Sequence, residues 1–189
     1  MDSSLFRNNL LYNNHASGIS LYAIDGAHGS SNNQVFNNAI VMAPNSRFVI
    51  NIPHDSGKAP VGNVIKNNIL YTPDNHGSVL IAAKTVSGFQ SDHNVVVNQF
   101  YDNGGNSLLT LRQWQALGYD LHSIVATPAQ LFVDPANNNY ALKAGSPAID
   151  AGVTLPQVPT DILGVTRPQG LAYDIGAYEL VAPSTPPKT

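Results

Sequence analysis

The sequence predicts an all-β protein built as a parallel β-solenoid of about four coils, with one short helix and a loop-rich C-terminal segment that wraps and caps the coils. Three observations favour this fold. A motif of about 30 residues repeats along the first half of the chain, and internal repeats of this length are typical of stacked architectures. Asn contributes 21 of the 189 residues, and Asn disfavours helix interiors and tolerates left-handed turns. The 15 Gly and 13 Pro, together with abundant Val and Ile, indicate short strands joined by many turns.

The repeat consists of four segments that align without gaps: SLFRNNLLY, NQVFNNAIV, NVIKNNILY and NVVVNQFYD. Each segment is a short apolar strand, an Asn turn and a second apolar strand. A third strand follows in the first three repeats, in GISLYAI, RFVINI and SVLIAA. Three short strands in about 30 residues make one coil of a parallel solenoid, and successive coils stack about 4.8 Å apart.

Stacking of coils predicts columns of like residues. The Asn residues at the start of each turn are Asn8, Asn37, Asn67 and Asn98. We expect the Asn pairs to form amide ladders that hold one corner of the coil and do no chemistry. The inward columns are predicted to contain Phe6, Val35, Ile65 and Val96 in one case, and Leu21, Ile50 and Leu80 in another.

The chain is predicted to have three parts. Residues 1–104 form the coils, residues 105–181 form a helix with wrapping loops and a cap, and residues 182–189 form a flexible tail. The helix is expected over Leu108–Leu117, with Gly118 ending it. Trp114 is expected to anchor this helix on the core.

Two parts of the sequence resemble a known family. The coils look like a right-handed parallel β-helix of the pectate-lyase-like superfamily. Residues 110–152 and the stretch DILGVTRPQGLAYDIGAYE resemble the C-terminal region of choice-of-anchor Q proteins and other bacterial β-helix carbohydrate-active proteins. The resemblance implies a secreted or cell-surface bacterial protein that acts on polysaccharide. It does not identify the reaction, because the superfamily hosts lyases, hydrolases and adhesins.

Composition excludes several other classes of protein. Charged residues make up only 11% of the chain and the formal net charge is −3, so the basic stripe of a general nucleic-acid binder is absent. No apolar run is long enough to span a membrane, and no N-terminal signal peptide is visible. The chain has no cysteine, which excludes a disulfide scaffold and thiolate metal sites.

A column of polar residues is the best functional signal in the sequence. Counting 17 positions from successive Asn turns reaches Asp25, His54 and Lys84, each after the third strand of its coil. Asp55 and His28 lie within three residues of this column. An acid, an imidazole and an amine side by side are unusual in a chain with few charges. The alternative is a solvated turn column in which these side chains satisfy one another.

The column predicts catalysis of one of two kinds, with Asp25, His54, Lys84 and Asp55 as catalytic residues. In a lyase, Lys84 or His54 abstracts the proton alpha to a uronate carboxyl, and a cation or Arg47 stabilises the enolate. In a glycoside hydrolase, Asp25 and Asp55 supply the pair of carboxyl groups that the reaction needs. His28 and Arg47 are the predicted substrate-binding residues.

No metal site can be assigned from the sequence. The chain has six His and eleven Asp but no tight ligand motif. The family resemblance makes a calcium ion at a coil edge the expected cofactor, if there is one.

Three functions follow from these observations. The first is a polysaccharide lyase or glycoside hydrolase that acts on an extracellular glycan. The second is a non-catalytic glycan-binding or structural β-helix module, and the third is a metal-assisted hydrolase of small esters or phosphoesters. The first coil follows Met1 directly and has no cap, so we expect either upstream coils in a longer protein or a homodimer through this edge.

Overall fold

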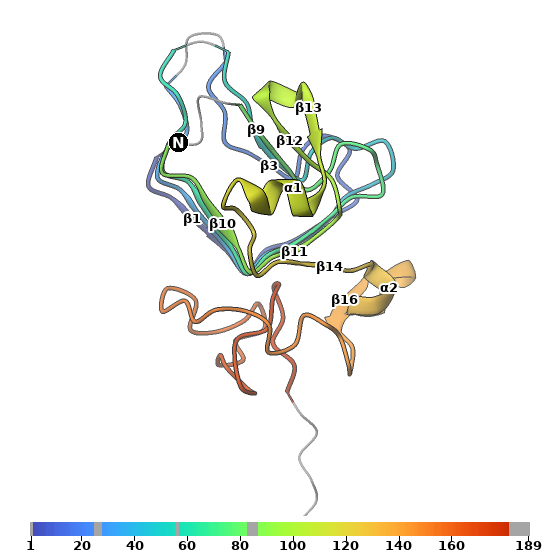
Figure 1. Cartoon of the computed structure of the whole chain (residues 1–189). Coiled ribbons are helices and arrows are strands. Elements are labelled where there is room, and N and C mark those ends of the chain that lie inside the picture. Colours follow the sequence, from blue (N-terminus) through green and yellow to red (C-terminus); the bar gives the residue numbers. More distant parts are fainter. Residues whose placement is uncertain (1, 25–27, 56, 83–86, 182–189) are drawn as a thin grey trace, which may run out of the picture.

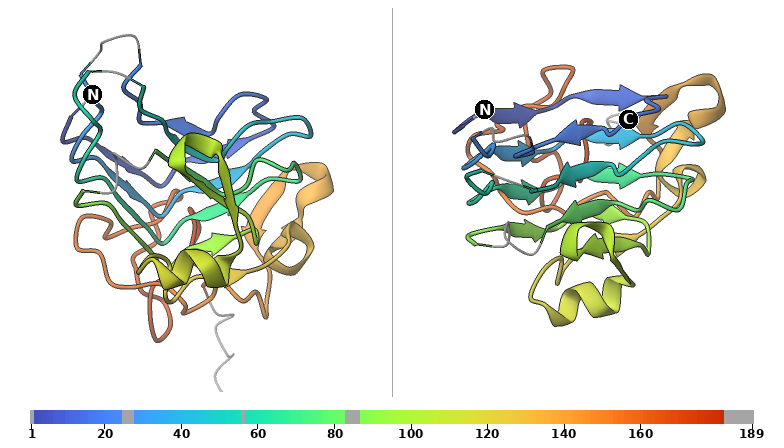
Figure 2. Two further views of the ribbon diagram at one scale, coloured as in Figure 1. Left: turned by 45° about the horizontal axis from the view of Figure 1, so that its top comes forward. Right: turned by 90° about the horizontal axis from the view of Figure 1, so that it is seen from above.

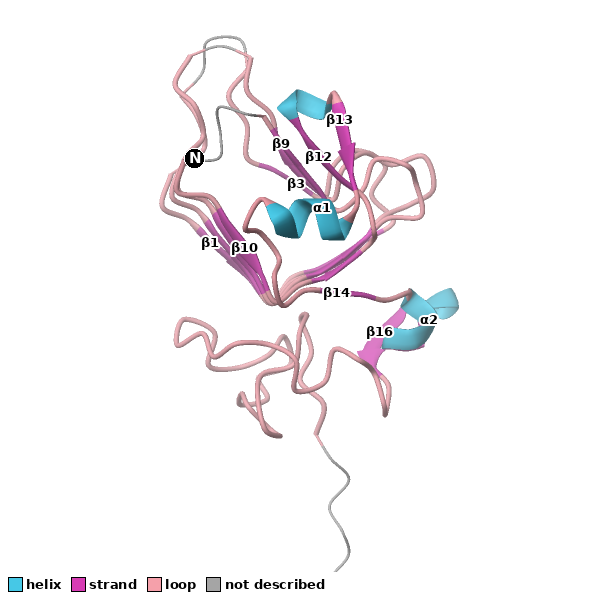
Figure 3. Ribbon diagram, in the orientation of Figure 1, coloured by secondary structure: helices cyan, strands magenta, loops and turns pink. Residues whose placement is uncertain are grey.

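The protein is a parallel β-solenoid of about four turns, seen along its axis in Figure 1. The computed structural model describes residues 2–24, 28–55, 57–82 and 87–181. Each coil contributes one short strand to each of three sheets, and the coils lie in layers when seen from the side (Figure 2). This arrangement confirms the predicted fold class, with strands and loops dominating and only short helices present (Figure 3).

The three sheets are built from strands of two or three residues. The first sheet contains β1 (Leu5–Arg7), β4 (Gln34–Phe36), β7 (Val64–Lys66) and β10 (Gln90–Asp92). The second contains β2 (Leu10–Tyr12), β5 (Ala39–Val41), β8 (Ile69–Tyr71), β11 (Val95–Val96) and β14 (Ile124–Val125). The third contains β3 (Ile19–Ser20), β6 (Ile50–Ile52), β9 (Val79–Ile81), β12 (Phe100–Asp102) and the antiparallel β13 (Ser107–Leu109).

Asn side chains, buried in each coil after the first, form the predicted ladder between the first two sheets. Asn38 Oδ1 accepts from the backbone N–H of Asn9 at 3.0 Å and from its side-chain amide at 2.8 Å. Asn68 accepts from Asn38 in the same way, and Asn94 accepts from Asn68. Asp120 ends the ladder by accepting from Asn94 Nδ2 at 2.9 Å. These bonds satisfy backbone groups at the turn, which supports a structural role for the ladder.

The predicted start of the fourth Asn turn, Asn98, was wrong by five residues, because His93 occupies the position of Asn67. Asn94, and not Asn98, continues the ladder, and it lies 26 residues after Asn68. The step from the third to the fourth Asn turn is therefore 26 residues, and not the 31 residues expected from the aligned segments. As a consequence, Ser91 lies opposite Ile65 in the first sheet. Val96, which we expected in that column, pairs with a residue of the second sheet.

The register of the third sheet also differs from the prediction. Ile50 pairs with Ile19 and Val79, whereas Leu80 pairs with Asn51, so Leu21, Ile50 and Leu80 do not form one column. The reason is that the turns between the second and third strands differ in length from coil to coil. They span residues 13–18, 42–49 and 72–78.

Helix α1 (Leu111–Ala116) lies across the end of the coil stack (Figure 1). It is shorter than predicted, because Leu108 belongs to β13, where it is exposed and pairs with Tyr101. Thr110 caps the helix through a capping box with Gln113. Trp114 is fully buried in the core cluster, as predicted.

The chain after β14 packs along the outside of the solenoid (Figure 1). It contains the unpredicted helix α2 (Pro128–Leu131), the antiparallel pair β15 (Phe132–Asp134) and β16 (Asn139–Leu142), and the 3-10 turn η3 (Pro135–Asn137). A second 3-10 turn, η2 (Asn103–Gly105), joins β12 to β13. The predicted tail, residues 182–189, lies outside the described residues.

The first Asn of each turn ties this outer segment to the coils. Asn8, Asn37 and Asn67 have left-handed backbones with φ of 54°, 51° and 56°. Their side-chain amides donate to backbone carbonyls of the outer segment, at Thr160, at Asp174 and Gly176, and at Val153. The two Asn residues of each pair therefore have different roles. The first Asn holds the outer segment against the coils, and the second Asn forms the ladder that joins successive coils.

The first coil presents an open edge among the described residues. β1, β2 and β3 are the terminal strands of their sheets, and Leu5 and Tyr12 on this coil are exposed. An open strand edge can pair with another chain. The homodimer through this edge stays a prediction.

Candidate functional site

The predicted catalytic column is only partly covered by the described residues. Asp25 and Lys84 lie outside them. His54 forms a parallel bridge opposite Ala23, which is two residues from the register that we expected. Its Nε2 lies 3.2 Å from the carbonyl oxygen of Gly57, and its Nδ1 is buried without a hydrogen-bond partner in the described part of the chain. The catalytic column therefore stays a prediction.

The other predicted site residues lie on different turns. Asp55 follows His54 and is exposed, and its backbone N–H donates to the carbonyl of Ala23. His28 is exposed, and its backbone forms an isolated parallel β-bridge with Lys58 of the next coil. Arg47 is exposed in the turn before β6.

A His–Asp–His cluster lies at the corner of the last coils. Registers of β10, β11 and β14 place His93 at the position of Asn67, and His122 one coil further on. His93 keeps the left-handed backbone of this corner, with φ of 54°. The two imidazole rings stack with centroids 4.7 Å apart and planes 23° apart, which is the distance between neighbouring coils.

The carboxylate of Asp92 contacts both histidines. Its Oδ1 accepts from the backbone N–H of His93 at 2.9 Å and of His122 at 2.8 Å. Its Oδ2 accepts from Nδ1 of His122 at 2.7 Å and lies 3.2 Å from Nδ1 of His93. Each of the three side chains offers one possible ligand atom, and these three atoms lie within 4.8 Å of one another. They form the one group of this kind found among the described residues.

Burial and hydrogen bonding act in opposite directions on these groups. Burial by itself raises the pKa of Asp92, but hydrogen bonds from the His122 side chain and from the backbone N–H groups of His122 and His93 outweigh it, and the pKa is lowered. The pKa of His93 is lowered by burial, and the charges of His122 and Lys66 add to this effect against the attraction of Asp92. A carboxylate therefore faces an imidazole that favours its neutral form, which is the form that binds metal ions.

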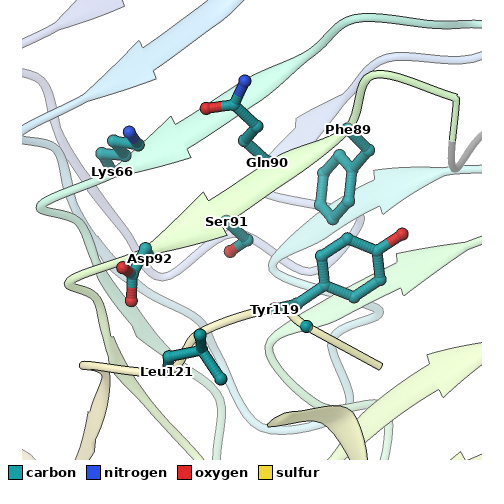
Figure 4. A pocket seen from close by; sticks show the side chains of 8 residues that line it. Lys66, Phe89, Gln90, Ser91, Asp92, Tyr119 and Leu121 are labelled. Carbon is teal, nitrogen blue, oxygen red and sulfur yellow. The ribbon is translucent and has the colours of Figure 1, made fainter. Parts of the chain in front are cut away.

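A hollow of about 190 Å³ adjoins this cluster (Figure 4). Asp92 lies at its edge, and Lys66 reaches it from the neighbouring coil. Tyr119 and Leu121, from the segment after α1, close the other side. The lining of the hollow therefore includes one acidic and one basic residue.

A second hollow, of about 390 Å³, lies on the outer face of the third sheet. Its ring wall consists of Phe48, His76 and Tyr101. Phe48 contacts the rings of His76 and Tyr101 edge-on, at 5.1 and 5.2 Å between centroids. Leu80, Gly104 and Gly105 also line the hollow. We call this site the aromatic hollow.

Polar groups fix the orientation of the ring wall. The Tyr101 hydroxyl donates to the carbonyl of Asn75 at 2.8 Å. Nδ1 of His76 lies 2.6 Å from Asp74 Oδ1, and this hydrogen bond is the main reason that the pKa of Asp74 is lowered. With Nδ1 engaged, Nε2 of His76 is the ring nitrogen left to meet a ligand.

Neither group of residues was predicted as a site from the sequence. A signal for the cluster exists, because His93 and His122 are 29 residues apart, the same step as between the first two Asn turns. The misaligned fourth coil hid this relation. No comparable signal marks the aromatic hollow, since its residues come from turns and strands of three coils whose register depends on turn length.

None of the helices in the described part of the chain is long and apolar enough to cross a membrane. Comparison of the chain with models of protein families, with curated proteins and with solved structures finds no match. The β-solenoid is therefore established by the structure alone, and the comparisons give no support to the family resemblance.

Proposed function

We propose that the chain is a glycan-binding β-solenoid and that the aromatic hollow is its binding site. The observation that carries this proposal is the ring wall of Phe48, His76 and Tyr101 on an outward sheet face. Ligand sites are mostly apolar and aromatic, with a few oriented polar groups. Sugar rings match such a surface because they carry apolar C–H faces and hydroxyls at their edges.

The polar groups of the aromatic hollow suit hydroxyl ligands. The Tyr101 hydroxyl donates to Asn75, so its oxygen keeps the capacity to accept from a sugar. His76 offers Nε2, because Nδ1 is bound to Asp74. A hydroxyl and an imidazole nitrogen beside an apolar ring wall suit the hydroxyls and the C–H faces of a saccharide.

The outer face extends the hollow along the solenoid axis. Tyr101 pairs with Leu80, Leu80 with Asn51, and Asn51 with Ser20. These outward positions form one row across four coils, spaced about 4.8 Å apart. A row of this kind can follow an extended polymer, so we infer a polysaccharide rather than a free monosaccharide. The resemblance to β-helix carbohydrate-active proteins agrees with this inference, and a secreted or cell-surface location follows from it as part of the proposal.

Replacement of the central ring should abolish most of the binding. We expect Tyr101→Ala to weaken binding to the preferred polysaccharide at least about tenfold, equivalent to about 1.4 kcal/mol, because an aromatic contact and a hydroxyl are lost together. The measurement is affinity gel electrophoresis across neutral and uronic-acid polymers. Tyr101→Phe keeps the ring and should retain an intermediate affinity.

Tyr12→Ala is the matched control, because Tyr12 is an exposed tyrosine on the second sheet. Its retardation should equal that of the wild type. Equal retardation of Tyr101→Ala and wild type would refute the aromatic hollow as the site. A wild-type chain that no polymer in the panel retards would refute glycan binding itself.

A catalytic role for the column at His54 is the second candidate function. The buried, unpartnered Nδ1 of His54 favours it. On uronic-acid polymers, aryl glycosides and aryl esters, we expect turnover that His54→Ala reduces about a hundredfold, equivalent to about 2.7 kcal/mol in the barrier. The exposed His15→Ala serves as control. Full activity of His54→Ala would contradict the role.

A further inference from the structure

We propose that Asp92, His93 and His122 bind one divalent transition-metal ion of the zinc class. This inference is independent of glycan binding, because the cluster lies at the corner between the first and second sheets and the aromatic hollow lies on the third.

The carboxylate of Asp92 is oriented before any ion arrives. Its Oδ1 is held by the backbone N–H groups of two successive coils, at 2.9 and 2.8 Å. Its Oδ2 consequently points at the two imidazoles, 2.7 and 3.2 Å from their Nδ1 atoms. A carboxylate fixed in this way keeps one oxygen for the metal, as ligands supported by outer hydrogen bonds commonly do.

The Nδ1 atoms of the two imidazoles lie near the same carboxylate oxygen because the solenoid repeats. His93 and His122 occupy the same position on neighbouring coils, so their rings stack at 4.7 Å and aim the same nitrogen at the same oxygen. Nδ1 of His93 is buried, and its one close polar contact is the 3.2 Å approach to Asp92 Oδ2, which does not have the geometry of a hydrogen bond. A metal ion between these atoms would give this nitrogen a well-directed bond in place of the contact with Asp92.

The distances from Asp92 Oδ2 to the two Nδ1 atoms, 3.2 and 2.7 Å, can reach those around a tetrahedral ion if the imidazole of His122 moves outward. Zinc binds histidine nitrogen and carboxylate oxygen at about 2.0–2.2 Å, which places neighbouring ligand atoms about 3.4 Å apart. The separation of Asp92 Oδ2 from His93 Nδ1 is already 3.2 Å. The shorter contact is with His122, whose side chain is 63% exposed and can move outward.

The ligand set selects the class of metal. Two imidazoles and one carboxylate suit zinc and its first-row neighbours, whereas calcium takes six to eight oxygen ligands. Three protein ligands also leave a fourth position for water or for an anion in the adjoining hollow. The nearby charge that opposes the ion is Lys66, on the neighbouring coil.

Titration calorimetry of the chelator-treated protein with Zn²⁺ tests the proposal. We expect one equivalent to bind, with a rise in melting temperature on addition of the metal. Asp92→Asn and His122→Ala should each weaken binding at least tenfold. His93→Asn is the most informative variant, because Asn occupies this left-handed position in the preceding coils and should preserve the fold while it removes the ligand.

Two controls separate the site from adventitious binding. His15→Ala removes an exposed histidine elsewhere and should bind Zn²⁺ as the wild type does. Excess Ca²⁺ should not displace Zn²⁺. If Zn²⁺ does not saturate at one equivalent, or if His93→Asn or Asp92→Asn binds it as tightly as the wild type, the proposal is overturned. Tyr101→Ala should leave Zn²⁺ binding unchanged, so glycan binding and metal binding can fail separately.

Discussion

Arg167→Met should destabilise the protein by about 3–5 kcal/mol, because it leaves a buried carboxylate without its counter-ion. The Arg167 and Glu179 side chains have no solvent-exposed surface, and Nη1 of Arg167 lies 2.6 Å from Oε2 of Glu179. The guanidinium also donates to the backbone carbonyls of Asp174 and Gly176, at 3.0 and 2.9 Å. Glu179 in turn accepts from the backbone N–H of Gln169. Loss of this one cation therefore affects the whole segment that covers the Asn corner.

The pH dependence of the stability lost in Arg167→Met tests whether the buried charge of Glu179 causes that loss. Burial raises the pKa of Glu179 and lowers the pKa of Arg167, and the attraction between them opposes both effects. Without Arg167, the pKa of Glu179 should rise further. A raised pKa means that the folded state binds the proton of Glu179 more tightly than the unfolded state does. The stability that this proton contributes is therefore complete below the ordinary pKa near 4.5, and it is lost as pH rises through the pKa of the folded state. The deficit of Arg167→Met relative to wild type should therefore shrink between pH 8 and pH 5.

Urea unfolding of both proteins across this pH range makes the measurement. Arg112→Met is the matched control, because Arg112 is exposed on α1, and it should change stability by no more than about 0.5 kcal/mol. A deficit below about 1 kcal/mol, or one that does not vary with pH, would show that the buried pair does not hold the outer segment.

The fold could be predicted from the sequence because a solenoid is specified locally. Each coil repeats a strand, an Asn turn and a strand, and the second Asn of each pair forms the same ladder wherever it occurs. Register could not be predicted in the same way. It depends on turn lengths, and a turn longer by two residues, as in 42–49 compared with 13–18, changes the partner of each residue that follows.

This limitation explains the outcome at the candidate sites. The equal-step count placed His54 beside position 25, but the longer second turn places it opposite Ala23. The same error in the fourth coil assigned the ladder to Asn98 and hid the correspondence of His93 with Asn67. The residue types alone indicated that polar side chains lie at the corners of the coils. Which of these side chains are neighbours depends on the length of each turn, and those lengths could not be predicted.

Trp114→Ala should cost about 3–5 kcal/mol of folding free energy, because the ring closes the end of the solenoid. Trp114 is fully buried and stacks on Phe100, with centroids 4.9 Å apart and planes 15° apart. Phe89 and Tyr119 pack around it. Removal of the indole leaves a cavity and opens the last coil to water, where unpaired strand edges and apolar side chains carry a penalty.

Trp114→Phe separates packing from hydrogen bonding. The indole Nε1–H donates to Asp120 Oδ2 at 2.8 Å, and the other oxygen of this buried carboxylate ends the Asn ladder. A phenyl ring keeps most of the stacking but leaves Oδ2 without this donor, so we expect a smaller loss of about 1–3 kcal/mol. Leu108→Ala, at an exposed position of β13, should lie within about 0.5 kcal/mol of wild type. Thermal and urea unfolding should rank the three variants in this order. If Trp114→Ala is no less stable than Trp114→Phe, the carboxylate and not the ring closes the end of the stack.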